Sequence, residues 1–384
     1  MTRLSSEIGS IDAHYDAVVV GSGYGGGIAA SRLARAGRRV CLLERGREIQ
    51  PGEYPDTELE ALGEMQADHP HGRLGKRTAL YDFRLNDDLS VFVGCGLGGT
   101  SLVNANVVLE PEPRVFEDPA WPLALRQDVA AGLRAGFERA KEMLKPRSYP
   151  GEAPPKLRAL EKSAAALGAH FERPPIAVSF ATGTNHVGVP QRACNGCGDC
   201  VSGCNHGAKN TVLMNYLPDA RNHGARIFTC AEVRRVERRA DRWVVHFRLL
   251  EAGREVFDAP DLFVAADVVV LAAGSLGSTE ILLRSRAHGL PLSSQLGKRF
   301  TGNGDFLAFG YNNDQLVNGI GFGHRSAESW KAEGRVPVGP CITGLADLRR
   351  RPALADGMVL EEGAIPGGVG AIASRVLAAA AGFV

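Results

Sequence analysis

The sequence predicts an α/β protein in which a parallel sheet domain is interleaved with an α+β domain that contains an antiparallel sheet. Over residues 15–44, a buried strand pattern, a glycine-rich turn, a helix pattern and a second strand pattern follow one another, which is the order of a βαβ unit. Another buried strand pattern at 267–273 again leads into a glycine turn and a helix. At 384 residues the chain exceeds the usual size of one domain, so we expect two.

The elements of the first half follow from their periodicity. The run YDAVVV (15–20) is apolar and β-branched, and RRVCLLE (38–44) returns to this character after the helical pattern IAASRLARAG. Residues 52–90 are polar and rich in Gly, Pro and His without a sustained period, so we expect a long excursion over the surface. Helices are expected over 123–144 and 155–167, where apolar residues recur every three or four positions.

The second half predicts further strands and a second sheet. A helix is expected over 211–223, a pair of strands over 225–250, and short antiparallel strands at 306–313 and 317–323. The apolar C-terminal run is interrupted by Arg375 and by glycines, which favours a buried or unfinished helix over a transmembrane segment. The expected domain boundaries are 1–123 and 191–304 for the parallel sheet domain, and 124–190 and 305–384 for the α+β domain.

Composition and charge exclude several classes of protein. The chain is 44% hydrophobic and 23% charged, and its 44 basic and 43 acidic residues give a net charge of +1. This balance indicates neither a nucleic-acid partner nor an anionic membrane surface. The N-terminus carries no secretory signal pattern, so we expect a cytoplasmic, reducing location in which disulfides are disfavoured.

Gly21, Gly23 and Gly26 form a G-x-G-x-x-G motif between the first strand and the first helix. Free backbone amides and the helix dipole can hold a pyrophosphate there. Glu44 ends the next strand, 18 residues after Gly26, where a carboxylate can accept both ribose hydroxyls of an adenosine. The motif predicts a Rossmann-type dinucleotide site but does not separate NAD from FAD.

Five segments in order carry a resemblance to a known family: GSGYGGG with LLERG, VGCGLGGTSLVNANVVLEP, VFEDPAWP, KNTVLMNYLPDA and VVVLAAGSLGSTEILLRS. The chain resembles the glucose-methanol-choline (GMC) oxidoreductases, and most of all their cholesterol-oxidase-like branch. The resemblance implies an FAD-binding domain at 1–123 and 191–304 and a substrate domain in the remainder. It also implies oxidation of an alcohol by hydride transfer to the flavin. A sterol-like or other small, neutral, hydrophobic hydroxyl compound is the expected substrate, with oxygen or a redox protein as electron acceptor.

The same resemblance assigns a second glycine turn to the flavin. Its residues are Gly94, Gly98, Gly99, Thr100, Ser101 and Asn104. Glycines there leave backbone amides open to the cofactor, which a side chain would block. Cys95 stands where relatives usually carry a basic or amide residue. By resemblance, Val233 contacts adenine through its backbone or is simply a core residue, Gly274 follows the strand over the dinucleotide, and Asn303 lies beside the flavin or in a turn.

The sequence identifies fewer candidate catalytic residues than candidate cofactor-binding residues. Relatives use a histidine from a C-terminal segment as base, and nothing in this chain matches that segment. By loose alignment, Glu362 falls where cholesterol oxidases carry an acidic group near the substrate, although Glu361 is equally arguable and a solvated loop carboxylate is the alternative. The chain is therefore expected to be an alcohol-oxidising flavoenzyme completed by a further segment or a second chain, or a flavin-binding or electron-transfer module without alcohol chemistry.

Cys194, Cys197, Cys200 and Cys204 have the spacing C-x2-C-x2-C-x3-C of a bacterial ferredoxin run, with Asn205 in place of the usual proline. Three interpretations remain open. An iron–sulfur cluster, bound by all four cysteines or by three and a partner elsewhere, would give the reduced flavin an electron exit. Zinc is the second interpretation, with His206 as a possible fourth ligand. Plain thiols or a local disulfide are the third.

Overall fold

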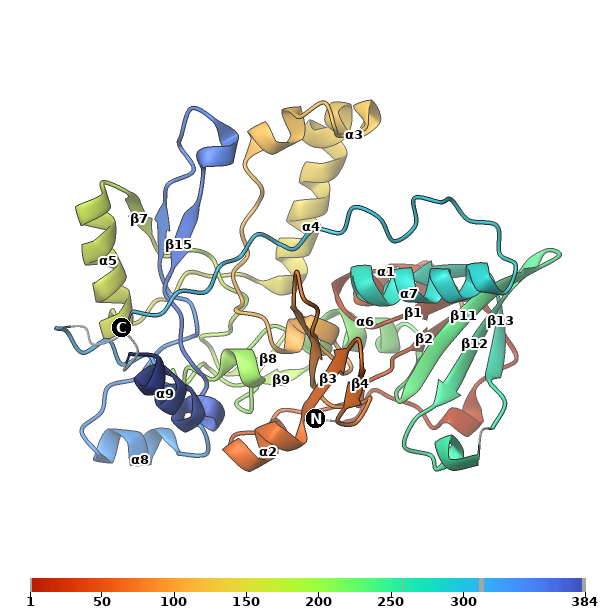
Figure 1. Ribbon diagram of the computed structural model, residues 1–384, viewed down its shortest axis with the longest axis horizontal. Coiled ribbons are helices and arrows are strands. Elements are labelled where there is room, and N and C mark those ends of the chain that lie inside the picture. The colour runs from red at the N-terminus through yellow and green to blue at the C-terminus, as the bar shows by residue number, and fades with distance from the viewer. Residues whose placement is uncertain (1, 258, 311–313, 382–384) are drawn as a thin grey trace.

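The computed structural model describes residues 2–257, 259–310 and 314–381. A six-stranded sheet forms its largest layer, in the order β10-β2-β1-β13-β12-β11 (Figure 1). Four of these strands are parallel neighbours, and β12 and β11 extend the sheet as antiparallel strands. Their bounds are β1 His14–Val20, β2 Val40–Leu43, β10 Arg226–Phe228, β11 Ala231–Arg239, β12 Arg242–Leu249 and β13 Leu262–Leu271. The parallel sheet predicted from the sequence is confirmed.

Apolar side chains cover both faces of this sheet, as continuous apolar strands require. Val19 and Leu42 pack into one core, together with helix α1 (Tyr24–Arg35) and helix α6 (Tyr216–Asn222). Their neighbours Val18 and Leu43 point to the other face, where the core includes Ile281 of helix α7 (Gly274–Ala287). The sheet is thus held from both sides, and the ends of β1 and β2 are fixed beside the first glycine turn.

The segment 52–90, for which we expected a long excursion over the surface, contains regular secondary structure. It contains the short helix α2 (Glu58–Gly63), capped reciprocally by Thr57 and Glu60, and most of a four-stranded sheet in the order β4-β3-β5-β6. The strands are β3 Met65–His69, β4 Gly72–Leu74, β5 Tyr81–Arg84 and β6 Val91–Gly94. Strands of three to five residues are too short for a period to emerge, and Asp68 of β3 forms ion pairs with Arg73 of β4 and Arg84 of β5.

An antiparallel sheet exists beyond the main sheet, but the predicted strands at 306–313 and 317–323 are wrong. No strand lies in the described residues 305–310, Ile320 forms only an isolated bridge with Ile365, and 311–313 lie outside the described residues. The sheet instead has the order β15-β14-β7. Its strands are β7 His170–Glu172, β14 Leu345–Asp347 and β15 Val359–Glu361, and helix α5 (Pro155–Leu167) packs against it.

The remaining elements follow the predictions more closely. The helix expected over 123–144 is α3 (Leu123–Asp128) and α4 (Arg134–Leu144), joined by a π-helical turn where Asp128 accepts a hydrogen bond from the Gly132 amide. Helix α9 (Gly367–Ala381) confirms the C-terminal helix. The other elements are helix α8 (Ala327–Ala332) and the small pair β8 (Gly183–Thr184) and β9 (Pro190–Gln191).

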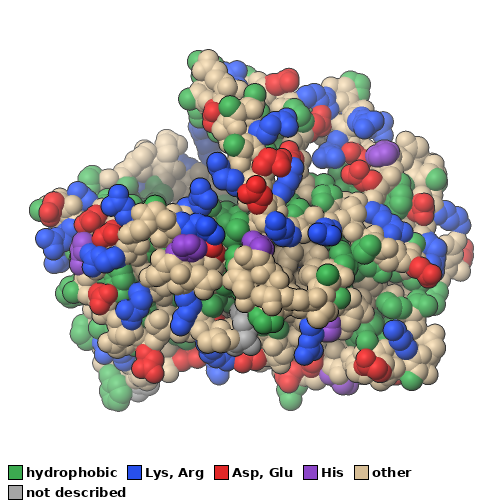
Figure 2. Space-filling model, turned by 180° about the vertical axis from the view of Figure 1, so that it is seen from behind, with side chains coloured by type: hydrophobic (Ala, Val, Ile, Leu, Met, Phe, Trp, Pro, Cys, Tyr) green, Lys and Arg blue, Asp and Glu red, His purple; other side chains and the backbone are tan. Residues whose placement is uncertain are grey.

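On the face shown in Figure 2, basic and acidic side chains are interspersed rather than segregated. Among the described residues, none of the helices combines the length and apolar character needed to cross a bilayer. The domain boundaries stated above stay a prediction.

Candidate cofactor site

The first glycine turn connects β1 to α1 and has the geometry that its motif predicts. Gly21 has φ +90°, and a Cβ added to it would lie 2.6 Å from the carbonyl oxygen of Ala272. A Cβ on Gly26 would lie 1.9 Å from the carbonyl oxygen of Gly21. A side chain at Gly21 would therefore push the first turn away from the segment that follows β13, and a side chain at Gly26 would push α1 away from the end of β1.

Gly23 caps the N-terminus of α1 without a side-chain hydrogen bond, so the first amides of this helix keep their donors for a ligand. A Cβ added to Gly23 would meet no atom within 4 Å. The space beside its backbone is therefore open, and a pyrophosphate can approach the helix N-terminus, where backbone amides and the helix dipole favour an anion. These residues fit the diphosphate of a dinucleotide.

The second glycine turn lies directly against the first, although the two are about 75 residues apart in sequence. A Cβ on Gly99 would lie 2.8 Å from the Cα of Gly23. The Gly98 amide donates to the Ser22 hydroxyl at 2.9 Å, and the Ser101 hydroxyl accepts from the Val212 amide at 3.0 Å. The structure thus brings together the two turns that the sequence assigned to one cofactor.

The other residues of the second turn lie before, within or after the 3-10 turn Gly99–Leu102. The Gly94 amide donates to the Thr100 hydroxyl at 3.1 Å, which closes the turn on the end of β6. The Asn104 side chain donates to the Tyr24 hydroxyl at 2.9 Å and so reaches the first residue of α1. Asn104 therefore connects the second turn to the helix that begins at the first.

Glu44 lies at the end of β2 and is buried. Its Oε2 accepts from the amide of Ser22 at 3.0 Å and from the Ser22 hydroxyl at 2.6 Å, while Oε1 accepts from the Gly46 amide at 2.7 Å. Because a carboxylate offers about four lone-pair directions, one remains on Oε1 for a ribose hydroxyl. Glu44 therefore supports the first turn and keeps acceptor capacity on Oε1; its ribose role stays a prediction.

The remaining predicted cofactor residues divide into two groups. Gly274 starts α7 beside the first turn, since a Cβ on Gly21 would also lie 2.8 Å from the Cα of Ala273. Val233 is 5% exposed and its side chain belongs to the core on the α7 side of the sheet. Asn303 is exposed and its side chain bonds Asp305, so the described contacts do not bring it to either turn.

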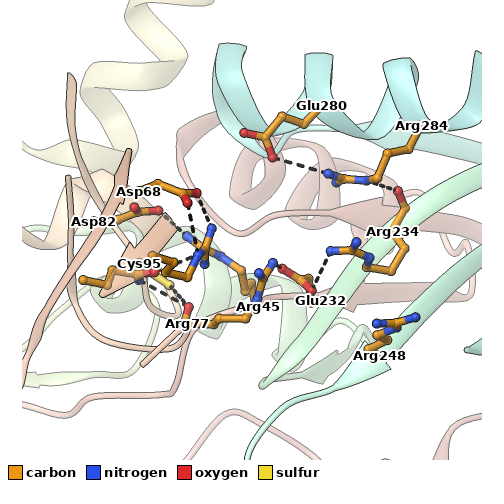
Figure 3. Close-up of polar contacts among 12 residues, drawn as sticks. Arg45, Asp68, Arg77, Asp82, Cys95, Glu232, Arg234, Arg248, Glu280 and Arg284 are labelled. Atoms are coloured by element: carbon orange, nitrogen blue, oxygen red, sulfur yellow. Dashed lines mark hydrogen bonds and ion pairs between the residues drawn. The ribbon is translucent and has the colours of Figure 1, made fainter. Parts of the chain in front are cut away.

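A network of arginines and carboxylates connects the four-stranded sheet to the main sheet and α7, and sequence reasoning missed it (Figure 3). The Arg45 guanidinium lies 2.5 Å from the Asp82 carboxylate. Arg84 pairs with Asp68 at 2.8 Å and with Glu280 of α7 at 3.1 Å. These bonds hold the sheet that leads into the second glycine turn. The alternation of Asp and Arg in short segments such as YDFR is the sequence pattern that could have indicated this network.

The second half of this network lies between the segment before β5 and strand β11 (Figure 3). Glu232 pairs with both Arg77 and Arg234. Burial, with the nearby charges of other arginines, lowers the pKa of Arg77 to about 10, so it remains charged at neutral pH. Cys95 is buried beside the Arg77 carbonyl, and this burial raises the pKa of its thiol to about 12. The Cys95 thiol is therefore uncharged at neutral pH.

Glu362 directly follows β15 and pairs with Lys156 of α5. Both elements lie away from α1 in Figure 1. Its Oε1 lies 2.9 Å from the buried Lys156 ammonium and accepts from the Thr343 amide at 2.9 Å. Burial raises the pKa of Glu362, against the effect of Lys156. Its contacts indicate a structural ion pair, while the neighbouring Glu361 is exposed.

The four cysteines of the run line one small cavity together with His206 and Lys209. Burial raises the pKa of Cys194 to about 12, so its thiol is neutral when no metal competes for the proton. In the described part of the chain, no group of three or more His, Cys, Asp or Glu side chains is placed to hold a metal ion. This finding supports neither a preformed zinc site at His206 nor a preformed iron–sulfur site at the four cysteines.

The sheet topology and the paired glycine turns define a Rossmann-type dinucleotide-binding protein. The family model described as GMC oxidoreductase matches residues 15–301. The chain therefore belongs to the GMC oxidoreductase family, as its sequence motifs indicated.

Individual relatives agree with this assignment. The chain is 32% identical over 303 residues to a cholesterol oxidase of Mycobacterium tuberculosis, covering 74% of this chain and 50% of the relative. It is 26% identical over 313 residues to a cholesterol oxidase of Acinetobacter baumannii, covering 76% and 55%. It is 26% identical over 337 residues to the long-chain-alcohol oxidase FAO3 of Arabidopsis thaliana, covering 85% and 41%. The chain spans about half the length of these curated relatives.

Proposed function

We propose that this chain binds FAD and forms the cofactor-binding part of an oxidoreductase that oxidises an alcohol. The observation that carries the proposal is the direct contact between the two glycine turns, with a Cβ on Gly99 only 2.8 Å from the Cα of Gly23. Bound FAD supplies the hydride acceptor. The amides at the start of α1 bind the diphosphate, Glu44 binds the ribose, and the amides after Gly98 face the flavin portion.

A small neutral alcohol is the proposed substrate. The relatives named above are described as cholesterol oxidases and a long-chain-alcohol oxidase, which supports a hydrophobic hydroxyl compound. The nearly balanced charge of the chain favours neutral over ionic substrates. Oxygen or a redox protein takes the electrons, and we propose a cytoplasmic location, where thiols stay reduced.

One observation favours a second candidate, a flavin-binding or electron-transfer module that does not oxidise alcohols by itself. Glu362, the acidic group that sequence alignment offered for catalysis, is held by Lys156 and Thr343 rather than at the glycine turns. In this candidate the flavin transfers electrons or has a structural role, and the protein carries out no alcohol chemistry.

The experiment that separates the two begins with FAD titration of the purified chain. Saturable binding of one FAD per chain, with no binding of NAD under the same conditions, is expected for both candidates. Anaerobic mixing of the loaded protein with cholesterol and with a long-chain primary alcohol then follows. Bleaching of the flavin absorbance supports alcohol oxidation by this chain. FAD binding without bleaching supports the module, and failure to bind FAD overturns both.

A further inference from the structure

A cavity of about 290 Å³ lies between the C-terminal end of α4 and the β8–β9 hairpin, and nothing in the proposed function accounts for it. Its walls come from the segments 143–147, 178–181, 185–191 and 210–215. None of the described lining residues belongs to either glycine turn. Ligand pockets usually measure about 300–1,000 Å³, so this cavity, which we call the Lys145 pocket, has a size suited to a small molecule.

Hydrogen bonds fix the walls of the Lys145 pocket. The Asn185 side chain accepts from the Val187 amide at 3.1 Å and donates to the Met214 carbonyl at 2.8 Å. The Asn210 side chain donates at 2.8 Å to the carbonyl of Leu144, the last residue of α4. The hairpin and the end of α4 are therefore both tied to the segment that leads into α6. Because the pocket is already formed, little ordering is needed when a ligand binds.

The charges that border the pocket are positive. Lys145 and Arg147 are exposed lining residues, and no Asp or Glu lines the pocket in the part of the chain that the structure describes. Neither of the two cationic side chains forms an ion pair with another described residue. An anion that enters the pocket would meet both charges without displacing a carboxylate. Lysine and arginine in this situation are typical binding groups for carboxylates and phosphates.

His186 indicates that these groups face one space. It lines the pocket next to Asn185, and partial burial lowers the pKa of its imidazole. The positive charge of Lys145 lowers that pKa further, so the Lys145 ammonium and the His186 ring lie near each other. The imidazole is therefore mainly neutral at neutral pH, and its N–H can donate a hydrogen bond to an oxyanion.

The backbone of Lys145 also points to a role for its side chain. Lys145 caps the C-terminus of α4 with φ +47° and ψ 50°, and Pro146 follows it. Glycine or asparagine is the usual residue in this left-handed cap conformation, which is strained for lysine. Glycine would suit the end of the helix better, so the lysine side chain needs another explanation, and an anion site supplies one.

Part of the pocket lining is apolar. Val178 is buried, and Met143 and Phe180 are partly buried. The centre of the Phe180 ring lies 5.8 Å from that of Tyr149, and this contact holds the ring in place. Apolar side chains beside the two charges favour an organic anion over an inorganic one, because they can cover its carbon atoms.

We propose that the Lys145 pocket binds a small organic anion. The carboxylate or phosphate group of this ligand lies between Lys145 and Arg147, and its apolar body lies against Met143, Val178 and Phe180. The site is independent of FAD, because its described lining residues include none from the glycine turns.

Isothermal titration calorimetry of the full chain with hexanoate and with hexyl phosphate tests this proposal, and hexanamide serves as the neutral probe. At least one of the two anions should bind with one molecule per chain, and the better one identifies the preferred group. Lys145→Gln combined with Arg147→Gln should weaken its binding by about 5- to 25-fold, as expected for two exposed charges. Arg158→Gln combined with Lys162→Gln is the matched control, because it removes two exposed charges from α5, outside the pocket.

Lys145→Gly separates ligand binding from folding. Because glycine relaxes the left-handed cap, this variant should be at least as stable as the wild type in thermal unfolding. It should nevertheless bind the anion up to about 5-fold more weakly, since one charge is lost.

Three results would overturn the proposal: no binding of either anion by the folded chain, equally tight binding of hexanamide, or equal affinities of the double variant and its α5 control. The titrations are repeated with and without FAD. A chain that binds FAD but neither anion would refute the anion site alone. A chain that binds an anion but no FAD would refute the proposed function alone.

Discussion

Replacement of Gly23 by alanine separates a role in cofactor binding from a role in folding. Gly23 has φ −63° and ψ −166°, which any residue can adopt, and an added methyl group meets no atom within 4 Å. In the protein without FAD, the variant should therefore be as stable as the wild type or more stable by about 0.4–1 kcal/mol. The methyl group fills the space through which the diphosphate reaches the amides of α1.

The expected loss of FAD affinity follows from the bonds that this methyl group displaces. One hydrogen bond to a charged group contributes about 1.5–3 kcal/mol, so loss of one such bond weakens FAD binding by about 10- to 150-fold. Titration of FAD against protein fluorescence measures the affinity, and thermal unfolding without FAD measures the stability. Gly136→Ala is the matched control, because a Cβ there also meets no atom within 4 Å but lies in α4, away from both turns.

The reasoning would be refuted if the Gly23 variant bound FAD as tightly as the Gly136 variant. Loss of the folded state in the absence of FAD would also contradict it, because the open space beside Gly23 would then not exist.

Three further predictions concern the fold and its charges. Gly99→Ala should lower the free energy of unfolding, measured by urea titration, by about 1–3 kcal/mol. The φ of +57° is strained for alanine, and the added Cβ would contact the first turn. An unchanged urea midpoint would contradict that contact. Glu362→Gln should cost about 3–5 kcal/mol by leaving the Lys156 ammonium without its buried partner; loss of turnover at unchanged stability would instead indicate catalysis. Arg239 holds the pKa of Glu237 at about 2, below its ordinary value of 4.5, so this carboxylate stabilises the protein above pH 4.5 and the contribution is lost as the pH falls toward 2. In Glu237→Gln, the loss of stability between pH 4.5 and 2 should be smaller than in the wild type. An equal loss would count against the pairing of Glu237 with Arg239.

The first glycine turn was predictable because the residues that form it are close together in sequence. Gly21, Gly23 and Gly26 act through the backbone of a turn between two elements that the sequence also predicts. The second turn could be assigned only by resemblance, since its contact with the first depends on the fold bringing Gly99 to Gly23.

The errors in the predicted fold have a common physical cause. The sheet within 65–94 consists of very short strands held by pairs such as Arg84 with Asp68, and such pairs leave no hydrophobic period to detect. The apolar residues Phe306 and Leu307 suggested a strand, yet they are 96% and 89% exposed. Their composition was typical of a strand, but no neighbouring strand pairs with them in the described residues.

The cysteine cavity was only partly predictable. The spacing of the run indicated closely placed thiols, but neither the Cys341 amide nor the Lys209 ammonium could be associated with it from sequence. Both reach the run through tertiary contacts.

Hydrogen–deuterium exchange of the backbone amides, with and without FAD, tests most directly whether the two glycine turns bind one cofactor. The account predicts that FAD slows exchange in residues 21–27 and 98–104 together, at the same FAD concentration, while α5 and α8 are unaffected. Protection of only one turn, or of neither in a protein that still binds FAD, would contradict the claim that the two turns hold one cofactor.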